Sequence, residues 1–297
     1  MTNRVVIVTG CSKGGIGYAL SQEFAAQGCR VYATARRVDT MGTFEDTRIS
    51  TMKLDVTSAS DVSEAVKVVL EHEGRVDMIV NNAARPHSGM YGPLAETSLD
   101  DAWNTFDTNV FGVLRLTQAV FPHMAAKKSG VIVNIGSIVG DTPAPWGGIY
   151  GSTKAALGRL SEILYMEVAP FNIRVMHVSP GGVKSNIATH ALNHWQLSLR
   201  EDSFYKPWFD SIARSIDESA GPLSITAEQF AKKVVKEALK PNPPRYMTLG
   251  AGAFGSALLQ WLPRAFVCWL MWQLVGGEGL WFLYGLSVQF RRLLRLE

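Results

Sequence analysis

The sequence has few cysteines and little excess charge, and each shortage argues against a class of protein. Its three cysteines, Cys11, Cys29 and Cys268, have neither metal-ligand nor redox spacing, so no metal site is expected. An odd and sparse count favours a reducing compartment, where disulfides do not persist. The formal net charge is only +3, from 29 basic and 26 acidic residues. This balance predicts no nucleic-acid partner, because such proteins concentrate basic charge on one face.

The sequence also lacks a long apolar segment near its start. The first apolar run covers residues 5–8, which is too short for the roughly 7–15-residue core of a secretory signal peptide. We therefore expect a cytoplasmic protein whose fold begins almost at the first residue. Hydrophobic residues make up 47% of the chain, which is enough to build a large buried core.

Short runs rich in β-branched residues alternate with helix-length segments. The expected strands are residues 5–8, 31–35, 78–80, 131–135 and 173–178. The expected helices include residues 16–27, 59–72, 99–124 and 150–168, and residues 38–49 are expected to form a loop. Continuous apolar runs are typical of parallel strands buried on both faces. The alternation therefore predicts an α/β fold with a doubly wound parallel sheet and right-handed crossovers.

A glycine-rich segment, residues 9–17, joins the first expected strand to the first expected helix. Glycines let the backbone approach a pyrophosphate closely, and the helix N-terminus offers free N–H groups at the positive end of its dipole. A tight turn also needs glycine, but the position between strand and helix favours a dinucleotide site. The candidate cofactor-binding residues of this segment are Gly10, Ser12, Lys13, Gly15, Ile16 and Gly17.

The second expected strand is followed by Arg36 and Arg37 instead of a carboxylate. A carboxylate there would accept hydrogen bonds from the adenosine ribose hydroxyls and repel a 2′-phosphate, whereas guanidinium groups bind that phosphate. Lys13 adds a positive charge from the glycine-rich segment. The pattern favours NADP(H) over NAD(H), and the alternative is an ordinary solvated basic loop.

Tyr150 and Lys154 are four residues apart in an expected helix, so their side chains emerge from one face. A nearby ammonium group lowers the pKa of a phenol and prepares it to exchange a proton near neutral pH. Ser137 follows the strand 131–135, from whose carboxyl end it can reach the same crevice and hold a substrate oxygen. Each feature alone is common, and their combination favours carbonyl or alcohol chemistry.

Together these motifs resemble the short-chain dehydrogenase/reductase family, in the expected order over about residues 4–190. The resemblance implies a Rossmann-type fold, NADP(H) as cofactor, and a catalytic tetrad of Asn109, Ser137, Tyr150 and Lys154. In that tetrad Ser137 and Tyr150 bind the carbonyl oxygen, and Tyr150 delivers the proton. Lys154 lowers the pKa of Tyr150 and holds the nicotinamide ribose, and Asn109 anchors a water-mediated proton relay. The further cofactor contacts that the resemblance implies are Asp55, Val56, Asn82, Ala83, Tyr150, Lys154, Pro180, Gly181, Val183 and Ser185.

The sequence departs from the family pattern in two ways. The glycine-rich segment is one residue longer than usual, because both Gly14 and Gly15 precede Ile16, which puts the local phosphate geometry in doubt. Ala84 and Ser185 replace the usual glycine and threonine and preserve size or hydroxyl chemistry. No reactive group is lost by either departure.

Residues 251–297 are expected to form an apolar helical extension to a catalytic domain of residues 1–250. The longest apolar run, residues 265–275, is short of the roughly 20 residues that a spanning helix needs. Aromatic residues and bordering arginines suit residues 254–286 to a membrane interface, and peripheral attachment to the endoplasmic reticulum or lipid droplets would follow. The alternatives are a lid over the cleft and a subunit interface.

Within the family, residues 10–20 and 32–37 and a late Trp-Leu-Pro segment resemble the branch of fungal NADPH-dependent 1-acyldihydroxyacetone-phosphate reductases. The resemblance implies a hydrophobic ketone substrate, for example an acyl-dihydroxyacetone phosphate. It leaves open a ketoreductase that tailors a polyketide, a steroid or another secondary metabolite. A non-redox NADP-binding or lipid-surface protein is less favoured, because Tyr150 and Lys154 are both present.

Two further expectations come from the family resemblance. Members are commonly homo-oligomers, dimers or tetramers, built on helices that correspond to residues 99–124 and 150–168. The segments that usually flank the substrate cleft contain Trp146, His190, His194 and Trp195, each of which is either a substrate contact or a packing residue.

Overall fold

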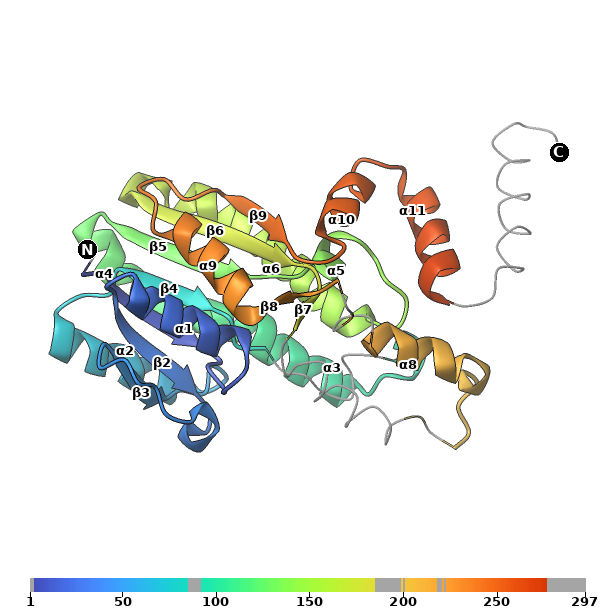
Figure 1. Cartoon of the computed structure of the whole chain (residues 1–297), viewed down its shortest axis with the longest axis horizontal. Helices are drawn as coiled ribbons and strands as arrows, with labels where there is room; N and C mark the ends of the chain where they lie inside the picture. The colour runs from blue at the N-terminus through green and yellow to red at the C-terminus, as the bar shows by residue number, and fades with distance from the viewer. Residues whose placement is uncertain are drawn as a thin grey trace.

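The computed structural model describes residues 3–84, 92–184, 199, 201–217, 221 and 223–276. A seven-stranded parallel sheet lies at the centre, in the order β3-β2-β1-β4-β5-β6-β9 (Figure 1). Its strands are β1 Val5–Thr9, β2 Arg30–Ala35, β3 Ile49–Lys53, β4 Met78–Asn81, β5 Gly130–Ile135, β6 Ile173–Pro180 and β9 Tyr246–Leu249. This order confirms the predicted doubly wound α/β fold.

Helices cover both faces of the sheet, and the strand sequences explain why. Successive side chains of a strand point to opposite faces, and all five residues of β1 are apolar or small and buried. Val6 and Val8 pack against one helix layer, α1 Ile16–Ala26 and α9 Ala227–Ala238. Val5 and Ile7 pack on the other side, against α2 Ala59–Glu73 and α4 Gly112–Lys127. The α6 helix, Gly148–Glu167, belongs to this second layer.

One expectation about the helices was wrong, whereas the expected loop after the second strand is confirmed. The segment 99–124 is not one regular helix: α3 Leu99–Phe106 is followed by a π-helical turn, Asp107–Phe111, before α4 begins. The segment 38–49 is a 3-10 turn, Val38–Met41, and a loop that leads into β3. Strands β3 and β9 were not expected, because both are edge strands with partly exposed residues and therefore lack a continuous apolar run.

Shorter elements complete the described chain. They are α5 Ile138–Asp141, α8 Phe209–Asp217, α10 Ala253–Leu259, α11 Arg264–Met271, the paired strands β7 Val183–Lys184 and β8 Ile225–Thr226, the 3-10 turns Leu94–Glu96, Ala169–Phe171 and Lys206–Trp208, and the π turn Trp272–Gly276. Helices α10 and α11 stand beyond the end of the sheet toward which the strand arrows point (Figure 1). They extend the main fold at the edge where parallel strands end.

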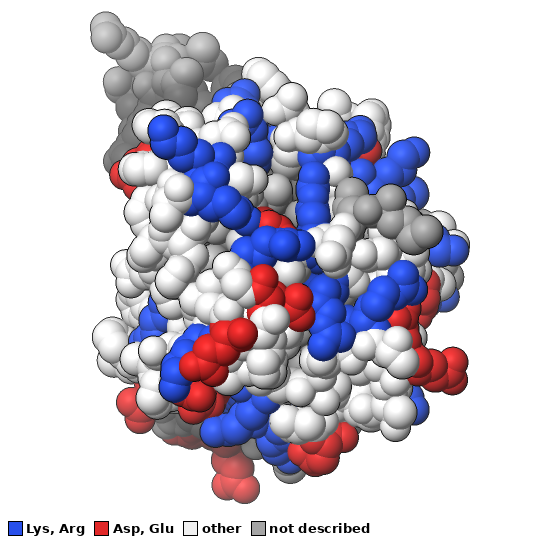
Figure 2. Space-filling model, turned by 90° about the vertical axis from the view of Figure 1, so that its left-hand side faces the viewer, with Lys and Arg blue, Asp and Glu red and all other residues white. Residues whose placement is uncertain are grey.

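The opposite end of the molecule carries charges of both signs (Figure 2). Asp77 accepts hydrogen bonds there from the Val5 backbone N–H at 2.8 Å and from Arg75 Nε at 3.0 Å, and it forms an ion pair with Lys127. These contacts fasten the starts of β1 and β4 to α4.

Candidate active site

The strand order reverses between β1 and β4, which opens a crevice at their carboxyl ends. In doubly wound sheets, ligands bind in the crevice at this position. The predicted motifs follow β1, β2, β4, β5 and β6 at the same edge of the sheet. Segments far apart in the sequence are therefore brought to one crevice by the topology.

Two glycines of the glycine-rich segment, Gly10 and Gly17, pack too closely against their neighbours to be replaced by residues with side chains. Gly10 has a φ of +73°, and a Cβ there would lie 2.7 Å from Ala83 Cα. A Cβ on Gly17 would lie 2.5 Å from the Gly10 carbonyl oxygen and 2.6 Å from Asn82 Nδ2. Asn82 Nδ2 in turn donates to the carbonyl oxygens of Thr9 at 2.8 Å and Gly10 at 3.1 Å. The predicted residues Gly10, Gly17, Asn82 and Ala83 thus form one tightly packed unit.

The additional glycine is absorbed by a turn before the helix. Gly14 adopts a φ of +76°, and the Gly15 N–H donates to the Ser12 carbonyl oxygen at 3.0 Å. Helix α1 then begins at Ile16, with Gly15 as an N-cap that offers no side-chain hydrogen bond. No acidic residue lies in the first turn either. The first-turn N–H groups are consequently suited to an anionic group such as a pyrophosphate.

A second loop brings basic side chains beside this turn. Arg36 and Arg37 directly follow β2 and are exposed, and neither forms an ion pair within the described part of the chain. The Lys13 N–H donates to the Thr40 carbonyl oxygen at 2.9 Å, and the hydroxyls of Ser12 and Thr40 lie 3.3 Å apart. The glycine-rich segment is thereby joined to the loop that carries both arginines.

Asp55 and Val56 have defined structural contacts. Asp55 Oδ1 accepts hydrogen bonds from the Thr57 N–H at 2.9 Å and the Thr57 hydroxyl at 2.7 Å. Val56 is buried and packs closely against Gly112. A Cβ added to Gly112 would lie 2.7 Å from Val56 Cγ2. These contacts fix the loop after β3, and an adenine contact by these residues stays a prediction.

Tyr150 and Lys154 share one face of α6, as their spacing predicts. Lys154 Nζ lies 5.5 Å from the centre of the Tyr150 ring, so the cation is beside the phenol. The Lys154 side chain is buried and donates to the Ile135 carbonyl oxygen at 2.8 Å. Burial lowers the pKa of Lys154 to about 8, because the charged form loses its hydration. The pKa of the Lys154 ammonium therefore lies near physiological pH.

Asn109 reaches the same helix from the π-helical turn. Its Nδ2 donates to Thr153 Oγ1 at 3.1 Å, and that hydroxyl donates to the Tyr150 carbonyl oxygen at 2.7 Å. π turns inside helices are frequent at functional sites, and this one holds a buried Asn109 against α6. This chain of hydrogen bonds links two of the four predicted catalytic residues, Asn109 and Tyr150, through Thr153.

Ser137 completes the constellation from the end of β5. It is the N-cap of the short helix α5, and its Oγ accepts a hydrogen bond from the Val139 N–H at 3.4 Å. Because the backbone donates to the hydroxyl oxygen, the hydroxyl hydrogen remains available to a substrate oxygen. Ser137 and Tyr150 both line one cavity.

The cavity measures about 500 Å³, and its wall is mostly apolar. Beside Ser137 and Tyr150 it includes Ile16 of the glycine-rich segment and the predicted residues Pro180, Gly181 and Val183. Its outer wall comes from the C-terminal segment, and none of these wall residues was predicted. They are Gly255, Ser256, Leu259, Met271, Leu274 and Val275.

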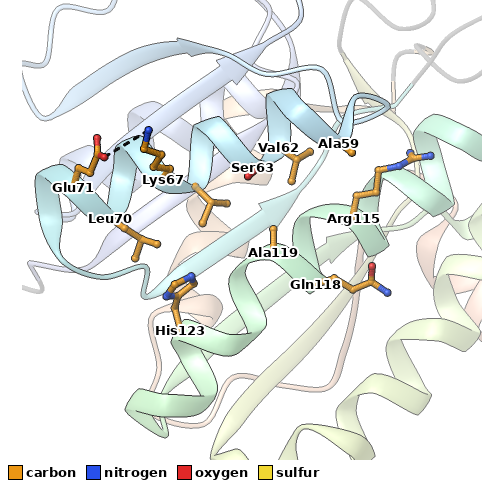
Figure 3. Close-up of a pocket in the computed structure, with 11 residues that line it drawn as sticks. Ala59, Val62, Ser63, Lys67, Leu70, Glu71, Arg115, Gln118, Ala119 and His123 are labelled. Carbon is orange, nitrogen blue, oxygen red and sulfur yellow. Dashed lines mark ion pairs between the residues drawn. The ribbon is translucent and has the colours of Figure 1, made fainter.

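A larger groove of about 650 Å³ lies between α2 and α4 (Figure 3). Leu70 of α2 faces Ala119 and His123 of α4 across it, while Lys67 points toward Glu71 of its own helix. None of the predicted catalytic residues lines this groove. The smaller cavity is therefore the candidate active site.

Trp146 anchors the wall of the cavity beside Tyr150. Its indole N–H donates to Ser211 Oγ at 3.2 Å, and Ser211 donates to the Val275 carbonyl oxygen at 2.5 Å. Trp146 has a φ of +69°, a strained conformation for a large side chain and one that is typical of functional sites. The structure thus gives Trp146 a packing role. Ser185, His190, His194 and Trp195 lie outside the described residues.

The fold and the crevice define a doubly wound α/β protein of the dinucleotide-binding class. Comparison with known proteins identifies the family. The sequence model described as short chain dehydrogenase matches residues 4–196, and the chain belongs to this family of oxidoreductases.

Three comparisons illustrate the likeness. The short-chain dehydrogenase PC-15 of Penicillium crustosum is 37% identical over 80% of this chain and 86% of its own. The NADPH-dependent 1-acyldihydroxyacetone phosphate reductase of Schizosaccharomyces pombe is 34% identical over 77% of this chain and 76% of its own. The solved structure of ElxO with NADP bound matches with a TM-score of 0.70 and 27% sequence identity. The match covers 86% of this chain and 100% of the ElxO chain.

The C-terminal helices are short. Among the helices that the structure describes, none has the length and apolar character needed to cross a membrane.

Proposed function

We propose that this oxidoreductase uses NADPH to reduce a hydrophobic ketone, with Asn109, Ser137, Tyr150 and Lys154 as its catalytic group. The observation that carries the proposal is the juxtaposition of Tyr150 and Lys154 at the wall of an apolar cavity that also contains Ser137. Bound NADPH supplies the hydride for such a reduction.

The residues of the crevice fit NADP(H). The uncapped start of α1 suits the pyrophosphate, and exposed Arg36 and Arg37 suit an adenosine 2′-phosphate. The yeast reductase and the ElxO structure, which are named for NADPH and NADP, support the same cofactor. Asp55, Val56, Asn82, Ala83, Pro180, Gly181, Val183 and Ser185 are the further contacts that we propose.

Each catalytic side chain has a distinct role in this proposal. Ser137 and Tyr150 donate hydrogen bonds to the substrate carbonyl oxygen, on which negative charge develops. Tyr150 then transfers its phenolic proton to that oxygen. Lys154 stabilises the resulting phenolate by its positive charge, and Asn109 fixes the helix backbone at Tyr150 through Thr153.

The lining of the cavity favours a neutral, hydrophobic substrate body. Its described wall consists of apolar residues, glycines and hydroxyl side chains and carries no charged group. Two of the hydroxyls, Thr142 and Ser256, are already paired at 2.8 Å. A polyketide, a steroid or a similar ketone suits such a wall.

A second candidate is an acyl-dihydroxyacetone phosphate, because the yeast reductase of that name is similar over most of both chains. Its acyl chain suits the apolar wall, and its phosphate needs a cation outside the described lining. Turnover of this ketone in preference to neutral ones would select this candidate.

Replacing Tyr150 with Phe tests the catalytic assignment. We expect NADPH-dependent ketone reduction to fall by about 10²–10⁴-fold, the usual contribution of a positioned general acid, while NADPH affinity by fluorescence titration is retained. Tyr165→Phe is the matched control, because it removes the same hydroxyl from the same helix, at a ring that packs against Arg245. An active Tyr150→Phe protein would contradict the assignment.

A further inference from the structure

The hairpin of α10 and α11 carries an apolar face that the rest of the described molecule leaves exposed. We call it the outer face, and it consists of Phe254, Leu258, Trp261, Leu262 and Phe266. Phe254 is 78% exposed and Trp261 is 89% exposed, so these aromatic rings stand almost wholly in solvent. Contiguous apolar exposure of this kind marks an interaction surface.

The exposure is not a consequence of loose packing, because the other side of the hairpin is firmly attached. Ala253, Ser256 and Val267 are buried, and Ser256 Oγ lies 2.8 Å from Thr142 Oγ1 at the cavity wall. Phe254 and Leu258 are four residues apart and share the opposite side of α10. The hairpin is therefore apolar on two sides. One side lines the cavity, and the other faces outward.

The hairpin carries one charge of its own, that of Arg264, whose Nη1 donates to the carbonyl oxygen of Asp141 at 3.4 Å. Arg264 is the only charged residue in the stretch 250–276, and it is exposed beside Trp261 and Phe266 in the sequence. Over residues 251–297 the sequence holds four arginines, at positions 264, 291, 292 and 295, against two glutamates, at positions 278 and 297. An apolar aromatic surface that carries an arginine is complementary to anionic lipid.

We propose that the outer face binds the interface of an anionic lipid bilayer. Tryptophan and phenylalanine insert at the boundary between headgroups and acyl chains, and arginine pairs with lipid phosphates at the same depth. The lipid surface is therefore the occupant that fits.

The same hairpin connects the bilayer to the active site. Leu259 of α10 and Met271 of α11 line the cavity, while Leu258 and Phe266 of the same helices lie on the outer face. A ketone dissolved in the membrane thus reaches the cavity without crossing bulk water. This last step rests on the proposed ketone reductase function, whereas lipid binding does not.

Flotation of the full-length protein with vesicles tests lipid binding. We expect the protein to float with vesicles that contain anionic phosphatidylglycerol in phosphatidylcholine, and less with pure phosphatidylcholine. The double variant Trp261→Ser/Phe266→Ser should bind at least about tenfold more weakly, because two aromatic side chains leave the apolar contact. Trp103→Ser, which removes a similarly exposed tryptophan from α3, should bind as the wild type does.

Three flotation results and one result in solution would overturn the proposal. They are the absence of flotation, flotation that the double variant does not weaken, and an equal loss in Trp103→Ser. If the double variant instead lowers the molecular mass in solution measured by light scattering, the outer face is an interface between copies of the chain and the lipid proposal is wrong.

A pair of ketones separates this proposal from the proposed function. The double variant should lose turnover of a ketone held in vesicles and keep turnover of a water-soluble ketone. Normal turnover of the vesicle-held ketone by the variant would overturn delivery from the bilayer. If the wild type reduces neither ketone and still floats, the proposed function fails while lipid binding stands.

Discussion

Lys154 is a basic side chain that the fold buries beside Tyr150. Burial opposes its positive charge, and the hydrogen bond to the Ile135 carbonyl oxygen at 2.8 Å only partly replaces water. Its pKa of about 8 therefore lies below the ordinary value of 10.5. The catalytic role that we propose for Lys154 explains why a buried ammonium lies 5.5 Å from the Tyr150 ring.

The lowered pKa predicts how activity depends on pH. The proposed role of Lys154 requires the charged form, so kcat/KM for NADPH, which reports the free enzyme, should fall as pH rises through about 8. Folding stability should change in the opposite direction: between pH 8 and 10.5 the unfolded chain binds more protons, so stability rises with pH. Lys154→Arg, which stays charged, should be less active and lack the decline near pH 8. The same decline in that variant would assign it to another group.

At the residue scale, the sequence predicted that Tyr150 and Lys154 lie together but not the hydrogen bonds that hold the residues around them. Tyr150 and Lys154 were recognised because a spacing of four fixes a shared helix face. The buried network behind them joins Asn81 to Asn134 at 2.8 Å, Asn134 to Ser161 at 2.9 Å, and Ser161 to His177 at 3.2 Å. Its members come from separate strands and helices, so their meeting depends on tertiary packing, which no local pattern encodes.

At the scale of elements, the end of β6 fixes the C-terminal segment to the sheet. The Gly181 N–H donates to the Leu249 carbonyl oxygen at 2.9 Å, and the Gly182 N–H donates to the Ala251 carbonyl oxygen at 2.9 Å. These contacts set where α10 begins and hence where the cavity wall stands. Buried strands were predicted well, whereas the edge strands β3 and β9 were not, because half-exposed strands lack a continuous apolar signal.

Gly181→Ala tests this junction. A Cβ on Gly181 would lie 1.9 Å from the Ala251 carbonyl oxygen, so β6 and the start of α10 must separate. We expect a loss of about 1–3 kcal/mol in the free energy of unfolding, measured with urea, together with weaker ketone binding. Gly255→Ala is the control, because its Cβ meets no atom within 4 Å and should stabilise α10 by about 0.5–1 kcal/mol. Equal stability of the two variants would contradict the close packing.

At the scale of the whole molecule, the cavity is assembled from parts that the sequence separates widely. Its wall combines residues from position 16 to position 275, and the C-terminal part closes it. The predicted boundary at residue 250 and the predicted homo-oligomer stay predictions. Exposed Ile163 and Met166 of α6 suit the expected helix-to-helix interface. The sequence could not specify the cavity, because its shape depends on how distant loops pack together.

The most direct test of the central claim is the initial rate of NADPH and NADH oxidation, followed in the near ultraviolet with a panel of hydrophobic ketones. We predict clear preference for NADPH, and a fall of about tenfold or more in that preference for Arg36→Ala/Arg37→Ala, because each guanidinium contributes hydrogen bonds to a charged phosphate. Equal use of NADH by the wild type, or a preference that survives in the double variant, would contradict the assignment of both arginines. Oxidation of neither cofactor with any ketone, together with a failure to bind NADPH, would contradict the account as a whole.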